Sequence, residues 1–419
     1  MPRKTSTLII ISLVILIIIA GSAYWFLFMR QSVTTTPTDT STSDSTFSPF
    51  NRNNGKQGSN STNNSTSTDT SSGQVVQPSL RLLSATPIGG YGASTTASTT
   101  FVRWVDRGRG NILEAYENSS DITTLSNTLL PRTYESIWNK DLSSFIGTIL
   151  GDDNQTVSTL FASIAPQATS SSGTPYLLRG KNLPDGIVSY ASSPKNDKIF
   201  LFVVQNNQGI GYVAPFNGGT AVQIFSTPIT QVNVEWPEDN TIAITTKGSA
   251  TDNGFLYFVS PKTGVWKKIL GPVAGLSTRV SHDAKYVLVS ATDGSNGLLT
   301  DIYSVASSTS NDAVVKTLAD KCAWGNFYKE AIYCAVPFQP VSGTYPDDWY
   351  RGNISSIDKM WQINARTGEI HLISSIFTAA KQNIDAYNLG LDTKDNYLFF
   401  MNKTDLSLWS LDLVTASGK

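Results

Sequence analysis

A repeated unit of about 44 residues constrains the fold of this chain more than any other feature. Each copy has a polar turn that leads into a short apolar strand, and a second hairpin recurs later in the copy. This repeat length is typical of a four-stranded propeller blade, and it does not suit helical or leucine-rich repeats. The turns begin at Trp138, Ser193, Trp236, Ser281, Trp324 and Leu391.

The spacing of these turns predicts where the blades lie. Residues 90–130 supply one further blade, with central strands at 101–105 and 111–116. No segment after residue 30 has the apolar spacing of an amphipathic helix, so the sequence predicts an all-β, seven-bladed β-propeller over residues 79–419. Six or eight blades also fit, because the first two blades are the least regular. The other six blades are predicted at about 131–185, 186–230, 231–273, 274–320, 321–381 and 382–415.

The final repeat lacks its outer strand. Residues 409–415 repeat the spacing of residues 361–367, but no counterpart of the strand at 369–373 follows them. All-β folds remove exposed sheet edges by closing the ring. We therefore predict that residues 79–85 pair with residues 406–411, an exchange of N- and C-terminal strands that closes the propeller.

The N-terminal residues predict a membrane anchor and a linker. Residues 8–28 form an uncharged apolar run that is long enough to cross a bilayer as a helix. Arg3 and Lys4 before the run favour a cytoplasmic N-terminus, which gives a cytoplasmic tip and transmembrane helix at 1–30. A signal peptide cleaved near Gly21 is the alternative. Residues 31–78 are rich in Ser, Thr and Asn and predict a disordered linker. Both interpretations place the propeller outside the cytoplasm, and the anchor, which we favour, also keeps it at the cell membrane.

The two cysteines are predicted to form a disulfide bond. Cys322 and Cys334 flank a turn centred near Tyr328, which makes them cross-strand partners in an antiparallel hairpin, with Trp324 and Ile332 as the next pair. Such partners lie within disulfide reach, and an extracytoplasmic compartment permits oxidation. Two buried thiols are the alternative.

Charge and motifs exclude several classes of function. A net charge of −1 argues against nucleic acid and against electrostatic docking on an anionic membrane. The two histidines, His282 and His371, have no nearby partner for a catalytic triad or a metal pair. The sequence has no Gly-x-Ser-x-Gly elbow, phosphate-binding loop or dinucleotide fingerprint. We therefore predict no catalytic residue, no metal and no cofactor.

A long insertion lies between Val336 and Met360, where the other blades have loops of about five residues. It is rich in Trp, Tyr and Arg, which dominate binding hot spots. The alternative is a lid that packs Trp349 and Tyr350 onto its own blade. The candidate binding residues in the insertion are Tyr345, Asp347, Asp348, Trp349, Tyr350 and Arg351.

The insertion joins the second and third strands of its blade, so it emerges on the same face as the equivalent turns of the other blades. Carboxylates there could bind a cation or act as acid and base, although Asp in such turns more often stabilises the turn itself. For the alternative that the chain is an enzyme, the candidate catalytic pairs are Asp347 with Asp348, or Asp152 with Asp153. The equivalent turns add Asp106, Arg107, Arg109, Asp152 and Asp153 to the candidate binding residues.

The units at residues 193–200 and 281–287 resemble those of TolB-like and WD-repeat propellers, although the Trp-Asp ending of WD repeats is absent. The whole layout resembles membrane-anchored propeller proteins of small-genome bacteria. The resemblance implies a fold and a habit of binding, and no particular activity. We expect a non-enzymatic, membrane-tethered, extracytoplasmic propeller that binds a protein or glycan in the cell envelope. The alternatives are a polysaccharide hydrolase or lyase that uses rim carboxylates, and a spacer or adhesin stalk.

Overall fold

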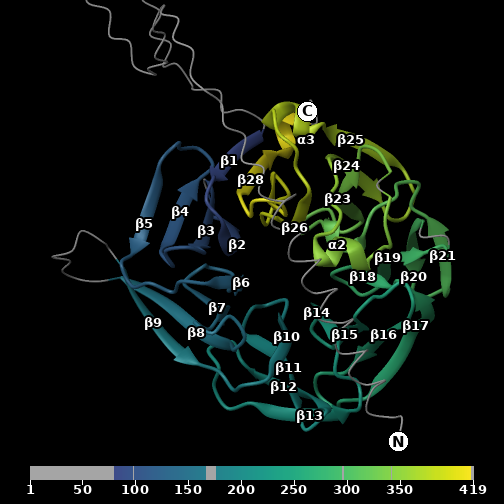
Figure 1. Ribbon diagram of the computed structural model, residues 1–419, viewed down its shortest axis with the longest axis horizontal. Coiled ribbons are helices and arrows are strands. Elements are labelled where there is room, and N and C mark those ends of the chain that lie inside the picture. Colours follow the sequence, from purple (N-terminus) through teal and green to yellow (C-terminus); the bar gives the residue numbers. More distant parts are fainter. Residues whose placement is uncertain (1–79, 98, 167–175, 295–296, 341, 417–419) are drawn as a thin grey trace, which may run out of the picture. The chain divides into compact units, whose positions relative to one another are not determined.

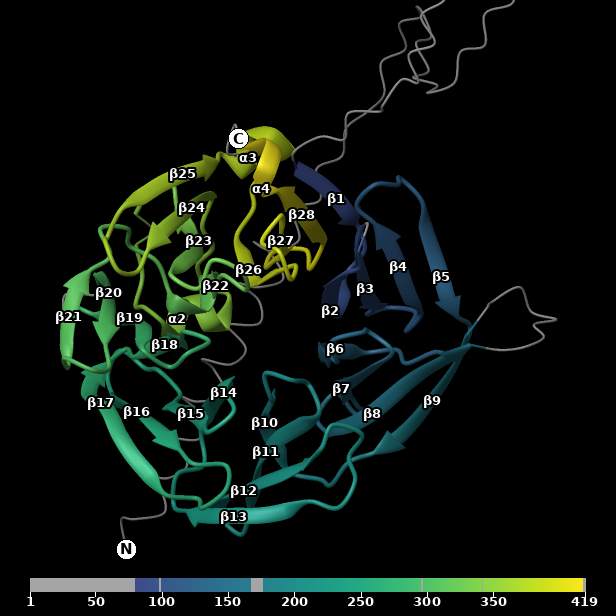
Figure 2. The ribbon, with the colours of Figure 1, turned by 180° about the vertical axis from the view of Figure 1, so that it is seen from behind.

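The computed structural model describes residues 80–97, 99–166, 176–294, 297–340 and 342–416. These residues form seven four-stranded antiparallel sheets arranged as a ring (Figure 1). The view from behind shows the same ring, with one strand of each sheet nearest its centre (Figure 2). The predicted all-β, seven-bladed propeller is therefore confirmed. The predicted linker at 31–78 and the apolar run at 8–28 lie outside the described residues.

Blades 1 to 4 follow one another along the chain, and each runs from its innermost to its outermost strand. The strands are β2 (Ile88–Thr95), β3 (Thr100–Asp106), β4 (Ile112–Tyr116) and β5 (Ile122–Ser126) in blade 1; β6 (Thr133–Trp138), β7 (Ser144–Leu150), β8 (Val157–Pro166) and β9 (Tyr176–Asn182) in blade 2; β10 (Ile187–Ser192), β11 (Lys198–Gln205), β12 (Gln208–Pro215) and β13 (Val222–Thr227) in blade 3; β14 (Val232–Glu238), β15 (Thr241–Thr246), β16 (Asn253–Val259) and β17 (Trp266–Ala274) in blade 4.

Blades 5 to 7 complete the ring, with short helices η1 (Ala319–Lys321), α2 (Asp347–Arg351), α3 (Ile376–Ala380) and α4 (Leu413–Ala416) between or after their strands. Every predicted blade matches an observed one to within a few residues. The strands are β18 (Ser277–Val280), β19 (Tyr286–Thr292), β20 (Leu298–Ser304) and β21 (Thr309–Asp312) in blade 5; β22 (Cys322–Trp324), β23 (Ala331–Pro337), β24 (Asp358–Asn364) and β25 (Ile370–Ser374) in blade 6; β26 (Ala386–Leu391), β27 (Tyr397–Asn402), β28 (Leu408–Asp412) and β1 (Leu80–Ser84) in blade 7.

The predicted ring closure is confirmed. Strand β1 pairs antiparallel with β28, with Leu80 opposite Leu411 and Leu82 opposite Trp409. The N-terminal strand is thus the outermost strand of blade 7, and the ring closes within one sheet (Figure 1). From β1, the Arg81 guanidinium donates a hydrogen bond to the carbonyl oxygen of Tyr116, 2.8 Å away in blade 1.

The repeated turns have a common physical cause. The Ser193 hydroxyl accepts a hydrogen bond from the backbone N–H of Lys198 at 3.1 Å, and the Ser281 hydroxyl accepts one from Tyr286 at 3.0 Å. A carboxylate does the same in blade 7, where Asp392 accepts the N–H of Tyr397 at 2.9 Å. Ser and Asp side chains stabilise turns by bonding to backbone groups a few residues away. The motif therefore marks the hairpin between the first and second strands of a blade.

The core lies between the blades. Phe399 and Phe400 are adjacent on β27 and both fully buried, so they face opposite sides of one sheet. Phe399 packs with Trp104 of blade 1, whereas Phe400 packs with Tyr333 of blade 6. Burial on both faces explains why the apolar alternation in the sequence is only partial.

The Cys322–Cys334 disulfide is confirmed, with a Cα–Cα distance of 4.2 Å. The register places Cys322 opposite Cys334 and Trp324 opposite Ile332, as predicted. Among the residues that the structure describes, no helix has the length and the apolar character that a membrane span requires.

Candidate functional site

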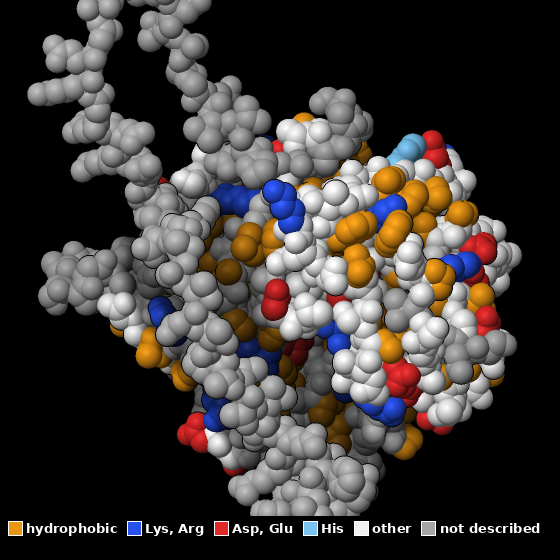
Figure 3. Space-filling model, turned by 45° about the horizontal axis from the view of Figure 1, so that its top comes forward, with side chains coloured by type: hydrophobic (Ala, Val, Ile, Leu, Met, Phe, Trp, Pro, Cys, Tyr) orange, Lys and Arg blue, Asp and Glu red, His pale blue; other side chains and the backbone are white. Residues whose placement is uncertain are grey.

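A cavity of about 760 Å³ opens at the centre of the ring, on the face that carries the connections between second and third strands. The space-filling view shows the molecule hollowed near its centre, with Lys, Arg, Asp and Glu side chains around the hollow (Figure 3). Inner strands of blades 2 to 5 supply much of the lining, and loops of blades 4 and 6 supply the rest. The lining contains five carboxylates and three cationic side chains.

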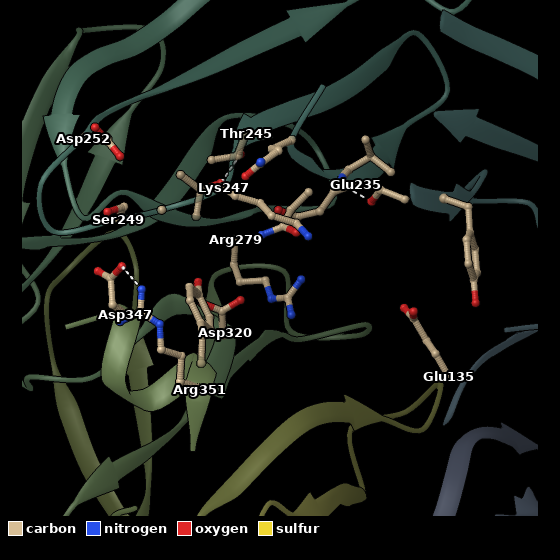
Figure 4. Close-up of a pocket in the computed structure, with 18 residues that line it drawn as sticks. Glu135, Glu235, Thr245, Lys247, Ser249, Asp252, Arg279, Asp320, Asp347 and Arg351 are labelled. Atoms are coloured by element: carbon tan, nitrogen blue, oxygen red, sulfur yellow. Dashed lines mark hydrogen bonds and ion pairs between the residues drawn. The ribbon is translucent and has the colours of Figure 1, made fainter. Parts of the chain in front are cut away.

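The innermost strands position four of these charged groups. Glu135 lies on β6, Glu235 on β14 and Arg279 on β18, and Asp320 lies on η1 just before the innermost strand of blade 6. Because side chains alternate along a strand, their neighbours pack between the sheets while these groups face the cavity (Figure 4). Lys247 joins them from the end of β15.

Enclosure by protein perturbs these groups. Burial raises the pKa of Glu235 to about 7, although the Arg279 guanidinium and the Val280 N–H, 3.2 Å from the carboxylate, act in the opposite direction. Burial also raises the pKa of Glu135, with Lys247 opposing. Neither glutamate makes an ion pair within 4.0 Å among the described residues. The cavity therefore contains two carboxylates that no cation neutralises by direct contact among the described residues; Glu235 is half-buried and Glu135 is exposed to the cavity.

The insertion of blade 6 forms one wall of the cavity. Tyr350 donates its hydroxyl hydrogen to Asp320 at 2.9 Å, and Arg351 is exposed, with one guanidinium nitrogen 3.7 Å from Asp347. Asp347 also accepts the backbone N–H of Ala250 at 2.7 Å, in the loop between β15 and β16 of blade 4. The insertion thus reaches past blade 5, and hydrogen bonds to Ala250 in blade 4 and to Asp320 next to blade 6 fix its position.

Trp349 anchors the insertion from within. It is 5% exposed and packs with Tyr345 and Leu318. Its indole N–H lies 3.1 Å from the Asp385 carboxylate, in the segment that leads into β26. Trp349 and Tyr345 are therefore buried, whereas Tyr350, which the lid alternative also packs onto the blade, is exposed. Tyr350 and Arg351 line the cavity.

Beneath Trp349 lies a buried ionic network. The Lys321 ammonium contacts Asp385 and lies 2.8 Å from Asp358, and all three side chains are at most 2% exposed. Burial opposes ionisation of Asp385, but Lys321 and hydrogen bonds from Trp349 and Ser356 outweigh it, so its pKa lies below its usual value. Burial raises the pKa of Asp358. Because one ammonium faces two carboxylates here, removing Lys321 would leave both buried carboxyl groups without a cation.

The carboxylates predicted from the turns mostly stabilise their own loops. Asp106 accepts the N–H of Arg109 at 2.6 Å, and Asp348 accepts that of Thr344 at 2.8 Å. Hydrogen bonds from Thr156 and Gln155 lower the pKa of Asp153 to about 2. Asp152 is fully exposed and lies 2.9 Å from Arg132. The cavity lining includes none of the predicted residues in blades 1 and 2, which are Asp106, Arg107, Arg109, Asp152 and Asp153.

Sequence reasoning missed Glu135, Glu235, Lys247, Arg279 and Asp320. One pattern in the sequence could have identified them: each is a charged residue within or next to an otherwise apolar segment near a repeated turn. Among the described residues, no group of three or more His, Cys, Asp or Glu is arranged to hold a metal ion.

Comparison with known proteins identifies the fold, and it identifies neither a family nor an activity. No protein-family model and no curated protein matches the chain. Similar solved structures include an oligogalacturonate lyase from Vibrio parahaemolyticus, at 10% identity and a TM-score of 0.51 over 80% of this chain and 92% of that one. TolB from Acinetobacter baumannii matches at 10% identity and a TM-score of 0.40, over 73% of this chain and 60% of its own length. The β-propeller domain of the Trilobed protease from Pyrococcus furiosus matches at 11% identity and a TM-score of 0.49, over 76% and 94%. At such identities the likeness shows a shared β-propeller fold alone.

Proposed function

We propose that this chain is a non-enzymatic binding protein, tethered to the cell membrane through residues 8–28, whose propeller captures a protein or glycan partner of the cell envelope outside the cytoplasm. The partner binds at the mouth of the central cavity, against Tyr350, Arg351 and Lys247. One observation carries the proposal: a central cavity lined by charged groups of both signs, several of which make no ion pair with any residue that the structure describes. Polar groups placed in a concave site in this way give a ligand orientation and specificity.

The fixed position of the insertion supports the same interpretation. The Trp349–Asp385 hydrogen bond and the Asp347–Ala250 hydrogen bond hold the insertion, so that Tyr350 and Arg351 are presented from a supported helix. A surface that is already ordered loses less conformational entropy when a partner binds. The insertion therefore suits recognition better than a flexible loop would.

The proposal is tested by partner recovery from native membranes. The full-length protein is expressed in its native cells as a Lys247→Ala, Arg351→Ala double variant, and proteins and glycans that co-purify with it are quantified. The matched control is Lys195→Ala with Lys285→Ala, which removes two exposed lysines from turns between first and second strands, on the opposite face. We expect the cavity variant to lose its partner and the control to keep it, at equal melting temperature. Equal recovery by both variants would refute binding at the cavity.

A second candidate function is cleavage of a polysaccharide. The raised pKa of Glu235, about 7, is the value expected for a carboxyl that acts as general acid or base near neutral pH, and Glu135 lines the same cavity. In this candidate function the acid and base would be Glu235 and Glu135 of the cavity, and not the carboxylates of the rim turns. Release of new reducing ends from envelope glycans by the wild type, and not by Glu235→Gln, would establish it. Absence of release by either protein would leave the binding function alone.

A further inference from the structure

Glu135 has an unusual position for an ionisable side chain. It projects from β6 into the interior of the central cavity, towards the side of Arg279 and Asp320 (Figure 4). It also lines a second, adjoining cavity of about 320 Å³. The carboxylate makes neither a hydrogen bond nor an ion pair among the residues that the structure describes. The side chain is exposed to the cavity, so a ligand that enters the cavity can reach the carboxylate.

Three tyrosines line the same two cavities as this carboxylate: Tyr190 lines the central cavity, and Tyr134 and Tyr387 line the smaller one. Glu135 acts electrostatically on the hydroxyls of Tyr134, Tyr190 and Tyr387 and contributes to the raised pKa of the first two. For Tyr387, burial raises the pKa to about 12 despite the nearby Arg107, and Glu135 contributes in the same direction. The Tyr190 hydroxyl is directed to Thr148, 2.8 Å away, and does not bind Glu135. The carboxylate thus shares its cavities with three tyrosines, and Lys247 is the cation that acts on it without an ion pair among the described residues.

Carboxylate and aromatic rings together are suited to an ammonium group. The ring face attracts a cation, and the attraction increases when the cation loses water. Arg279 lies beside Glu235, and Lys247 reaches the cavity on an exposed side chain that can move aside. The geometry therefore leaves Glu135 as the acidic group that an incoming cation would meet.

We propose that Glu135 binds the ammonium group of a lysine side chain that a partner protein inserts into the cavity, between the rings of Tyr134, Tyr190 and Tyr387. This inference rests on the proposed binding function and assigns the chemistry of the partner. Glu135 is the third residue of β6, so it lies about 7 Å below the start of the strand. The four methylenes of a lysine reach that depth from a backbone held at the mouth. The amine of an amino sugar is attached to its ring, which would have to enter the cavity whole.

The test uses the full-length protein and a defined probe, the capped peptide acetyl-Gly-Gly-Lys-Gly-Gly-amide, titrated by NMR. Its matched probe has Nε-acetyl-lysine in place of lysine, which keeps the stem and removes the charge. We expect the lysine peptide to bind at least about tenfold more tightly than the acetylated one. Glu135→Gln should remove this difference, and Glu369→Gln, an exposed acid on the outside of blade 6, should retain it. Tyr387→Leu, which keeps the charge, should weaken binding about two- to fivefold.

Equal binding of the two peptides, or undiminished binding by Glu135→Gln, would overturn the inference. Binding of glucosamine, and not of the lysine peptide, would overturn it in favour of an amino-sugar ligand. If Glu135→Gln keeps its native partner while the Lys247→Ala, Arg351→Ala variant loses it, the proposed function stands and the role of Glu135 fails. The two ideas can therefore fail separately.

Discussion

Trp349 and Arg351 lie two positions apart on α2 and have opposite roles. Trp349 is buried and hydrogen-bonded to Asp385, whereas Arg351 is exposed at the cavity mouth. Trp349→Ala should lower the free energy of unfolding by about 3–5 kcal/mol, because it leaves a void above a buried ionic network. Arg351→Ala should change it by less than about 0.5 kcal/mol. Urea denaturation of the two full-length variants measures both, and equal losses would contradict the assignment.

Glu117 makes the stability of the ring closure depend on pH. Burial is the main cause that raises its pKa, from 4.5 to about 7, although Arg81 of β1, 3.7 Å away, opposes the shift. One of its carboxylate oxygens has no hydrogen-bond partner among the described residues. In the folded state the carboxyl group retains its proton to higher pH than in the unfolded state. Its contribution to the free energy of unfolding is therefore complete below pH 4.5 and is lost as the pH rises through 7.

Glu117→Gln should therefore be more stable than the wild type at pH 8, by up to about 3 kcal/mol, and the difference should shrink towards pH 5. Unfolding by urea at several pH values between these limits gives the comparison. If the free energies of unfolding of the wild type and of Glu117→Gln differ by the same amount at every pH in this range, burial of Glu117 does not control the pH dependence.

Single residues also show where the sequence stops predicting the site. Tyr350 and Arg351 could be found because the insertion stands out in length and composition. Glu135 and Glu235 could not, since each is one charged residue in an apolar strand. Such a residue resembles an ordinary solvent-facing position until the inner strands of several blades converge. For Trp349, the sequence left open whether the side chain is buried or exposed, and the structure buries it.

Among the elements, the short strand β1 is important because it closes the ring by pairing with β28. The truncated last repeat predicted its partner correctly. The sequence did not predict the irregularity between Leu82 and Ser84. Because successive side chains on a strand point to opposite faces, Leu83 is 1% exposed and packs against blade 1, whereas Leu82 is 43% exposed. Leu82 and Leu83 thus provide a matched pair of positions for mutation, one exposed and one buried.

Leu83→Ala should lower the free energy of unfolding by about 2–5 kcal/mol, because it opens a cavity in the core between blades 7 and 1. Leu82→Ala should lower it by less than about 1 kcal/mol, since that side chain is largely in water. Denaturant unfolding of both variants tests the closure. Comparable effects would mean that β1 does not pack as described.

On the scale of the whole molecule, seven similar blades make a ring, and the insertion of blade 6 breaks its symmetry at the cavity mouth. The repeats in the sequence encode hairpin turns and buried strands, so they predicted the blade boundaries and the disulfide register. They carry no information on which side chains meet at the axis, because those groups come from strands far apart in the chain. The central claim is therefore that the cavity face, and not the opposite face, engages the partner.

Site-specific photo-cross-linking in native membranes tests that claim most directly. A benzophenone amino acid replaces Tyr350 at the cavity mouth or, as the control, Tyr328 in the turn between β22 and β23 on the opposite face. Both tyrosines are exposed, at 40% and 52%, so accessibility does not separate them. We predict a discrete cross-linked product at position 350 that disappears when Lys247 and Arg351 are changed to Ala, and none at position 328. The same product at both positions, or a product at 328 alone, would contradict the account.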